Sequence, residues 1–222
     1  MYVFVYGTLR YGHERHDILE NARFVGYGFI KGFKLYNLEF YPAIAKENGI
    51  VYGEVYEISP ETLKTLDWIE GHPTLYKRIT VTAYFDKNQK HKLENVYTYL
   101  YNQPIESAKP IPDGEYSKAK KKPIILNYFI YTPNIIKEIK PIKIVKVILH
   151  NYKLTFNKLH ANIVKASGQK VHGVLYIVTL KELEQLNKLK NQYMQETVKV
   201  HDVRGRSYYA QAHVEIPLQK WE

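Results

Sequence analysis

The sequence predicts an α+β protein made of two tandem copies of one domain, and two observations support this fold class. Segments in which apolar and polar residues alternate, as in half-buried strands, recur along the chain, with one helical segment in each half. The segment at 51–58, VYGEVYEI, also reappears 120 residues later at 171–178 as VHGVLYIV. Because a repeat at a fixed offset sets the architecture, the 222 residues are expected to form two domains of ordinary size.

The same offset exposes one chemical difference between the two copies. Leu63 aligns with Leu183, as expected for a helix that follows the repeated strand. Glu70 of the first copy, however, aligns with Lys190 of the second. We therefore expect the first copy to be able to do chemistry and the second to have lost that ability.

Composition narrows the class of protein. Apolar residues make up 45% of the chain, which also holds 21 tyrosines, as in a folded globular protein. The absence of cysteine excludes disulfides, thiol nucleophiles and cysteine metal sites, and it fits a cytoplasmic setting. The first seven residues lack the basic start of a signal peptide, and no apolar run approaches the roughly 20 residues of a membrane span.

Charge is unevenly shared between the halves. Residues 1–108 hold 12 basic and 13 acidic side chains, a net charge of −1, whereas residues 109–222 hold 20 and 9, a net charge of +11. A basic half is compatible with nucleic acid or another polyanion as a partner. Because the lysines are scattered and no nucleic-acid motif accompanies them, a solvated lysine-rich surface is the favoured interpretation.

The strands of the first copy can be placed in order. β-prone residues alternate at 2–6, and residues 13–20 suit a short helical turn. Aromatic residues and glycines at 24–35 favour strand, turn and strand, and 41–44 is a short extended piece. The strongest alternation, at 50–58, predicts a half-buried strand.

The segment that follows carries start and stop signals of a helix. Ser59 is a good N-cap, and Pro60 suits the first helical turn. The helix is expected to end near Gly71, because glycine readily adopts the left-handed conformation that ends helices. Strands are expected again at 76–85 and 94–101.

A linker is expected between the copies. Residues 103–123 lose the alternating pattern and carry four prolines and a lysine-rich run. The first domain then covers 1–102 and the second copy covers 124–222. In the second copy, Thr179 stands where the first has its serine N-cap and should cap a helix at 180–190.

The first candidate site is the turn after the opening strand, Tyr6-Gly7-Thr8-Leu9-Arg10. A strand that runs into a glycine-containing turn leaves several backbone N–H groups unpaired, and such a nest binds an anion such as a carboxylate. Gly7 would also allow a ligand to approach the backbone closely.

Glu70 is the second candidate. It lies four residues after Leu66, on the apolar face of the helix and in its last turn. Partial desolvation and the helix dipole would both raise the pKa of its carboxyl toward the range useful for a general base. The alternatives are an exposed glutamate at the helix end or one that is paired with Arg78.

Other features leave their alternatives open. Gly53 in mid-strand predicts either a bulge or a close approach by a ligand or another backbone. His13 and His16 have the spacing of a metal pair, but without a third ligand nearby surface histidines are the favoured interpretation. His72 could line the site beside Glu70 or lie in an exposed loop.

Taken together, the motifs resemble the gamma-glutamylcyclotransferase-like superfamily, in its AIG2-like and gamma-glutamylamine cyclotransferase branch. The resemblance covers about residues 1–102 and rests on segments and single positions that occur in the family's order. These are Tyr6–Arg10, Tyr41–Ile44, Val51–Ile58, Leu66, Asp67, Glu70, Pro73, Tyr76 and Arg78.

The resemblance implies a mixed β-barrel with flanking helices and a cavity at its mouth. It implies a small γ-glutamyl substrate held by the amides of the Tyr6–Leu9 turn, with Glu70 as the catalytic general acid and base. Tyr76 matches a tyrosine near that site and would position the substrate. The implied reaction releases 5-oxoproline; because the substrate supplies its own nucleophile, no metal or cofactor is expected.

The second copy resembles the same superfamily more distantly and departs from it at the site. Thr132 replaces the glycine of the turn, Pro133 removes an amide donor, and Lys190 replaces the glutamate. A decayed structural copy is the favoured interpretation, although the lysine could pair with an acidic ligand. A non-enzymatic binding or scaffold protein on this fold, with a basic half that contacts a polyanion, is the alternative function.

Overall fold

A computed structural model gives the fold of the chain and describes residues 1–105, 107–116, 125–130, 139–157, 160–179, 182–183, 185 and 193–215. The chain forms two compact units, Met1–Ile124 and Ile125–Glu222. Among the described residues, none of the helices combines the length and the apolar character that crossing a membrane requires.

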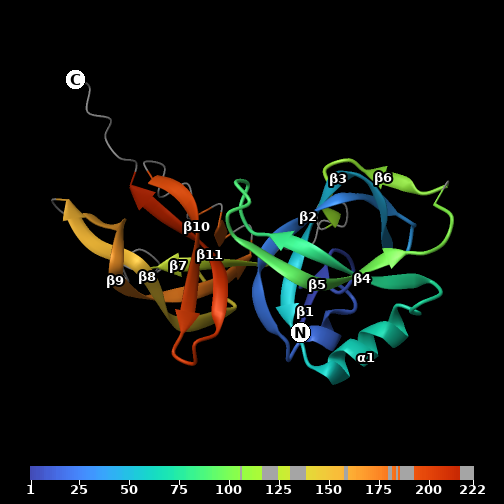
Figure 1. Cartoon of the computed structure of the whole chain (residues 1–222), viewed down its shortest axis with the longest axis horizontal. Helices are drawn as coiled ribbons and strands as arrows, with labels where there is room; N and C mark the ends of the chain where they lie inside the picture. The colour runs from blue at the N-terminus through green and yellow to red at the C-terminus, as the bar shows by residue number, and fades with distance from the viewer. Residues whose placement is uncertain are drawn as a thin grey trace. The chain divides into compact units, whose positions relative to one another are not determined.

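The first unit is a mixed β-barrel with one helix beside it (Figure 1). Its strands follow the order β3-β1-β5-β4-β2-β6, and a further pairing of β2 with β3 closes five of them into a ring. Only β1 and β5 run parallel; the other neighbours are antiparallel. The elements are β1 (Tyr2–Val5), η1 (His16–Leu19), β2 (Arg23–Asn37), β3 (Pro42–Glu57), α1 (Pro60–Ile69), β4 (Tyr76–Tyr84), β5 (Lys92–Tyr101) and β6 (Lys109–Ile111).

Two strands of this unit are longer than the sequence indicated. The turn predicted within 24–35 is instead an irregularity in β2, where the register to β3 shifts between Lys31 and Phe33. Gly32 lies there with a φ of +82°, which explains why a glycine occupies this point of a continuous strand. The extended piece predicted at 41–44 is the start of β3, which continues to Glu57.

The barrel encloses an apolar core to which β1 contributes from both of its faces, since Val3, Phe4 and Val5 are all buried. The strand predicted at 50–58 is not half-buried, because β3 is buried at every residue from Gly53 to Tyr56. Large, fully buried apolar side chains come from β1, η1, β2, β3 and α1: Phe4, Leu19, Ile30, Leu35, Ile44 and Leu66.

The predicted linker is wrong over its middle part. Residues 109–111 form β6, in which Ile111 pairs with Leu35 of β2. The next turn returns to the barrel, where the Gly114 carbonyl accepts a hydrogen bond from the Tyr52 amide at 2.9 Å. Glu115 and Tyr116 are buried, so this segment belongs to the first unit. Residues 117–123 lie outside the described part of the chain.

The second unit is a closed barrel of five strands in the order β10-β11-β7-β9-β8. They are β7 (Ile125–Ile130), β8 (Lys143–Asn157), β9 (His160–Thr179), β10 (Tyr193–Asp202) and β11 (Ser207–Glu215). The predicted Thr179 cap is present, since the Thr179 hydroxyl accepts the Glu182 amide at 3.5 Å and the Glu182 carboxylate in turn accepts the Thr179 amide at 2.8 Å. The helix predicted at 180–190 lies largely outside the described residues, as do Thr132, Pro133 and Lys190.

One packing detail recurs in both units and supports the duplication. A Cβ on Gly53 would lie 2.4 Å from the Val5 carbonyl oxygen and 2.6 Å from the Phe4 ring. A Cβ on Gly173, 120 residues later, would lie 2.5 Å from a β7 carbonyl oxygen and 2.4 Å from the Phe129 ring. In each barrel, therefore, a glycine in the long strand lets the first strand and its phenylalanine come close.

Candidate active site

A pocket of about 80 Å³ opens beside the end of β1. A single water needs only about 10–15 Å³ of such volume, so the pocket can hold a larger group. Its walls come from β1 and the following turn, the start of β3, the end of α1 and the start of β4. The lining residues are Phe4, Val5, Tyr6, Gly7, Thr8, Leu9, Arg15, Tyr41, Pro42, Ile69, Glu70, Leu75, Tyr76 and Tyr99.

The structure brings all the predicted site residues to this pocket. Tyr6, Gly7, Thr8 and Leu9 form one wall; Glu70 lines the same space from the end of α1, and Tyr76 lines it from the start of β4. The set comes from segments some 60 residues apart in sequence, which only the barrel places together.

The turn after β1 is fixed by packing at Gly7. A Cβ there would lie 2.2 Å from Cγ of Pro42, so only glycine fits against this ring. The close approach that the sequence suggested for a ligand is therefore made by a proline of β3. Further along, the Arg10 amide donates to the Gly7 carbonyl at 3.0 Å, which closes the turn.

The turn keeps backbone donors available. The Arg15 amide donates to the Thr8 carbonyl at 3.1 Å, and the His16 ring donates from Nδ1 to the Leu9 carbonyl at 3.0 Å. The carbonyls are thus used, whereas the amides of Thr8 and Leu9 donate to no backbone carbonyl within the part of the chain that is described. Such an arrangement suits an anion or a polarised carbonyl oxygen.

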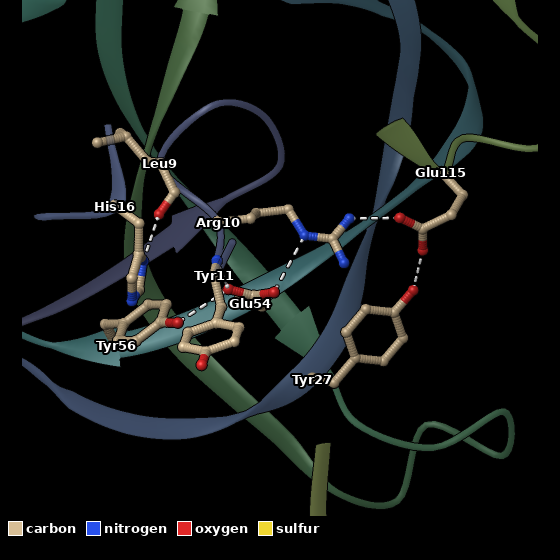
Figure 2. Close-up of polar contacts among 8 residues, drawn as sticks. All are labelled: Leu9, Arg10, Tyr11, His16, Tyr27, Glu54, Tyr56 and Glu115. Carbon is tan, nitrogen blue, oxygen red and sulfur yellow. Dashed lines mark hydrogen bonds and ion pairs between the residues drawn. The ribbon is translucent and has the colours of Figure 1, made fainter. Parts of the chain in front are cut away.

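A buried ion cluster holds the turn in place, and Figure 2 shows it extending from Arg10 to two carboxylates. Arg10 is 0% exposed; its Nε donates to Glu54 at 3.3 Å, and its Nη1 pairs with Glu115. Burial alone would lower the pKa of Arg10, but the two carboxylates outweigh it and raise that pKa. Removing one member of such a cluster would leave an uncompensated buried charge.

Further donors complete the cluster. Tyr56 donates its hydroxyl to Glu54 at 2.8 Å, and the Tyr11 amide donates to the same carboxylate at 2.9 Å. Tyr27 donates to Glu115 on the other side (Figure 2). The composition around Glu115 is typical of a linker, and no local pattern assigns a role to Glu54, because both carboxylates act through Arg10, far away in the sequence.

Helix α1 presents Glu70 at a well-defined end. The Ser59 hydroxyl accepts the Thr62 amide at 3.1 Å and starts the helix. At the other end, the His72 amide donates to the backbone carbonyl of Asp67 at 2.9 Å, and the Gly71 amide donates to the backbone carbonyl of Trp68 at 3.2 Å. With Gly71 at a φ of +60°, this is the Schellman arrangement.

The backbone of Glu70 is held from both sides. Its amide donates to the Leu66 carbonyl at 3.0 Å, and its carbonyl accepts the Tyr76 amide at 3.2 Å. The main chain therefore fixes where the carboxylate leaves the helix, and only side-chain torsions can move it.

Burial raises the pKa of the Glu70 carboxyl from its ordinary value of 4.5 to about 7, while Arg15 opposes this effect. A group with such a pKa is half protonated near neutral pH, so it can accept and return a proton. The prediction that desolvation tunes this carboxyl is supported by its half-buried position in the pocket.

The tyrosines of the pocket act as fixed walls with bound hydroxyls. Tyr6 donates to the Tyr99 carbonyl and Tyr76 to the Pro42 carbonyl, both at 2.7 Å. Burial, together with nearby groups that include Glu70, raises the pKa of Tyr6 and Tyr76 far above the ordinary range, so both stay protonated. Tyr76 therefore lines the pocket with its hydroxyl already donated to the backbone.

Several alternatives from the sequence are now decided. Arg78 pairs with Asp67, which also accepts the Tyr99 hydroxyl at 2.7 Å, so Arg78 is not the partner of Glu70. His72 accepts the Arg78 amide at 3.1 Å and is not among the residues that line the pocket. His13, which was expected at the surface, is buried and stacks on the Tyr116 ring, and His16 is half-buried.

Arg15 is the charged pocket residue that no sequence motif indicated. It lies five residues beyond the motif, in a stretch without secondary structure. Its position in a pocket with Glu70 follows from the backbone bond to Thr8, which no local pattern reveals.

The family model and two relatives that match this chain all carry the name gamma-glutamylcyclotransferase. The family model described as "Gamma-glutamyl cyclotransferase, AIG2-like" matches residues 3–118 and 131–222. The protein MJ1514 of Methanocaldococcus jannaschii is 34% identical over 118 residues, which are 52% of this chain and 94% of that protein. The "Gamma-glutamylcyclotransferase family protein YtfP" of Escherichia coli K12 is 31% identical over 116 residues, 52% of this chain and 96% of that protein.

Two solved structures are similar. Protein PH0828 of Pyrococcus horikoshii has 30% sequence identity and a TM-score of 0.45, and the match covers 55% of this chain and 93% of that one. YkqA of Bacillus subtilis has 23% identity and a TM-score of 0.43, and that match covers 97% of this chain and 83% of the other.

Proposed function

This chain belongs to the gamma-glutamyl cyclotransferase, AIG2-like family, and from this premise we propose that its first unit converts a γ-glutamyl compound into 5-oxoproline and a free amine. One observation carries the proposal: Glu70, with a pKa of about 7, shares a pocket with the turn at Gly7–Leu9. A proton-transfer group thus lies in the same small cavity as free backbone donors.

The reaction is an intramolecular aminolysis. The α-amine of the γ-glutamyl group attacks its own γ-carbonyl carbon, a carbon–nitrogen bond forms, and a five-membered lactam results. The bond from the same carbon to the departing nitrogen breaks, so the amine leaves. Holding the glutamyl chain in this folded shape can supply several kcal/mol of the barrier, because the reacting atoms are already close.

Glu70 balances the protons. Its carboxylate takes one proton from the attacking nitrogen, and the resulting acid returns that proton to the departing nitrogen. The second proton, which the α-ammonium group must also lose to become the lactam N–H, ends on the released amine or in water. The carboxyl ends the cycle as it began. A pKa of about 7 suits both halves of this role, because neither protonation state is strongly disfavoured at neutral pH.

The turn at Gly7–Leu9 is proposed to stabilise the negative charges of the substrate electrostatically. The amides of Thr8 and Leu9 are proposed to donate to the substrate, either at its carboxylate or at the γ-carbonyl oxygen as negative charge develops there. Arg10 is a positioning residue, since its buried ion pairs with Glu54 and Glu115 hold the turn rather than touch the pocket. Tyr6 and Tyr76 shape the cavity around the glutamyl chain.

The test is a panel of γ-glutamyl amino acids and γ-glutamyl amines assayed for 5-oxoproline. We expect Glu70→Gln to fold like the wild type and to lose turnover by roughly two to four orders of magnitude, the usual contribution of acid–base catalysis. Glu61→Gln is the matched control, since it removes an exposed carboxylate from the first turn of the same helix. Unchanged turnover in Glu70→Gln would remove this residue from the mechanism.

A further inference from the structure

The pocket contains two side chains of opposite charge. Of its lining residues, Glu70 is the one acid and Arg15 the one base, and all the others are neutral. The field of Arg15 reaches the carboxyl of Glu70, where it opposes the effect of burial. A ligand that carries both a cationic group and an anionic group would complement these two side chains.

Arg15 also differs from the other arginines of the first unit. Arg10, Arg23 and Arg78 each pair with a carboxylate. The Arg15 side chain makes no ion pair with any residue of the described ranges, and it is exposed at the pocket. An arginine beside a cavity without a protein partner is suited to a carboxylate supplied by a ligand.

The backbone of Arg15 is tied to the turn that lines the pocket. Its amide donates to the Thr8 carbonyl at 3.1 Å, and the next residue, His16, donates to the Leu9 carbonyl at 3.0 Å. The backbone of Arg15 is therefore held next to the free amides of Thr8 and Leu9, within reach of the same pocket.

We propose that Arg15 binds the α-carboxylate of the γ-glutamyl group, which it recognises together with Glu70 as one half of an α-amino-acid zwitterion. The inference rests on the proposed function and deepens it by assigning the charged end of the substrate. The α-ammonium and α-carboxylate groups share one carbon, so when Glu70 receives the ammonium the carboxylate must lie close by. Arg15 is the cation that the pocket offers there.

This assignment leaves the γ-carbonyl oxygen to the amides of Thr8 and Leu9. It also makes the free α-carboxylate a requirement of the substrate, whereas the departing amine needs no charge. The substrate class is thus any γ-glutamyl compound whose α-amino and α-carboxyl groups are both unmodified.

The experiment measures binding apart from turnover. The full chain is titrated calorimetrically with 5-oxoproline and with its α-carboxamide, in the wild type, Arg15→Gln and Arg15→Lys. Lys64→Gln is the control, because it removes one positive charge from an exposed position on α1 outside the pocket. We expect Arg15→Gln to weaken 5-oxoproline binding about tenfold and to change carboxamide binding less than about twofold, as for loss of a charge-assisted hydrogen bond at a solvated site.

Each outcome has a defined meaning. Equal losses for both ligands in Arg15→Gln, an equal loss in Lys64→Gln, or no detectable binding of 5-oxoproline by the wild type would overturn the inference. The inference would also be overturned if Arg15→Gln bound 5-oxoproline normally and lost turnover only on substrates whose departing amine carries a carboxylate. Selective carboxylate binding without any release of 5-oxoproline from the panel would support the Arg15 site and refute the proposed reaction.

Discussion

The raised pKa of Glu70 makes the acid limb of the pH–rate profile a direct test of the mechanism. The pKa of its carboxyl is about 7 instead of 4.5, because the pocket removes water from it. General-base catalysis needs the carboxylate, so kcat/KM should follow the ionised fraction in the free enzyme. The α-ammonium group of the substrate loses its proton only at alkaline pH. The acid limb of the profile therefore reports the ionisation of the enzyme.

The expected magnitude follows from the two pKa values. With a pKa of about 7, the ionised fraction falls from about 90% at about pH 8 to about 3% at about pH 5.5, a loss of roughly thirtyfold. With the ordinary value, the same change of pH would lower the ionised fraction by only about 10%.

The assay is the initial rate of 5-oxoproline release at low substrate concentration, measured across this range of pH. Arg15→Gln supplies an internal check, since removing the cation that opposes the burial effect should move the acid limb to higher pH. An acid limb near 4.5, or a limb that stays in place when Arg15 is removed, would refute the assignment of Glu70 as the base in this pocket.

Three further perturbations test the structure around the site. The folded state holds the proton of Glu70 more tightly than the unfolded state does, so the stability of the wild type falls as pH rises from 4.5 to about 7. The Tm of Glu70→Gln should therefore exceed that of the wild type at about pH 8 and match it at about pH 4. Gly7→Ala places a Cβ 2.2 Å from Cγ of Pro42, so we expect a loss of roughly 1–3 kcal/mol in urea unfolding together with reduced turnover, and unchanged values would contradict the packing. Arg10→Met leaves Glu115 buried without its cation and should cost roughly 3–5 kcal/mol; a loss below about 1 kcal/mol would show that the cluster is not a structural unit.

Much of the fold could be predicted from the sequence because it is encoded locally and twice. The helix from Pro60 to Ile69 has its cap, its buried leucines and its terminal glycine within a dozen residues. The repeated strand gave the duplication without any knowledge of contacts. Glu70 could be selected for a related reason, since an acid on the buried face of a helix end contradicts the surrounding pattern.

The features that the sequence did not reveal depend on contacts between residues that are far apart along the chain. The segment around Glu115 looked like a linker because prolines and lysines dominate its composition, yet its residues pair with β2 and bury a carboxylate against Arg10. Gly7 was interpreted as room for a ligand, although the room is filled by Pro42. In both cases the deciding neighbour lies more than 30 residues away, beyond the reach of periodicity or turn signals.

The bond between Arg10 and Glu115 has a consequence for how this unit comes into being. A ribosome delivers Arg10 and its turn among the first residues, but the Glu115 carboxylate that pairs with Arg10 emerges only about a hundred residues later. Without Glu115, Arg10 has only Glu54 of its two carboxylate partners, and the Tyr27 hydroxyl lacks its acceptor. Any attempt to excise a minimal active fragment must therefore carry the chain through Tyr116, because a cut after β5 would discard part of the scaffold that shapes the opening turn.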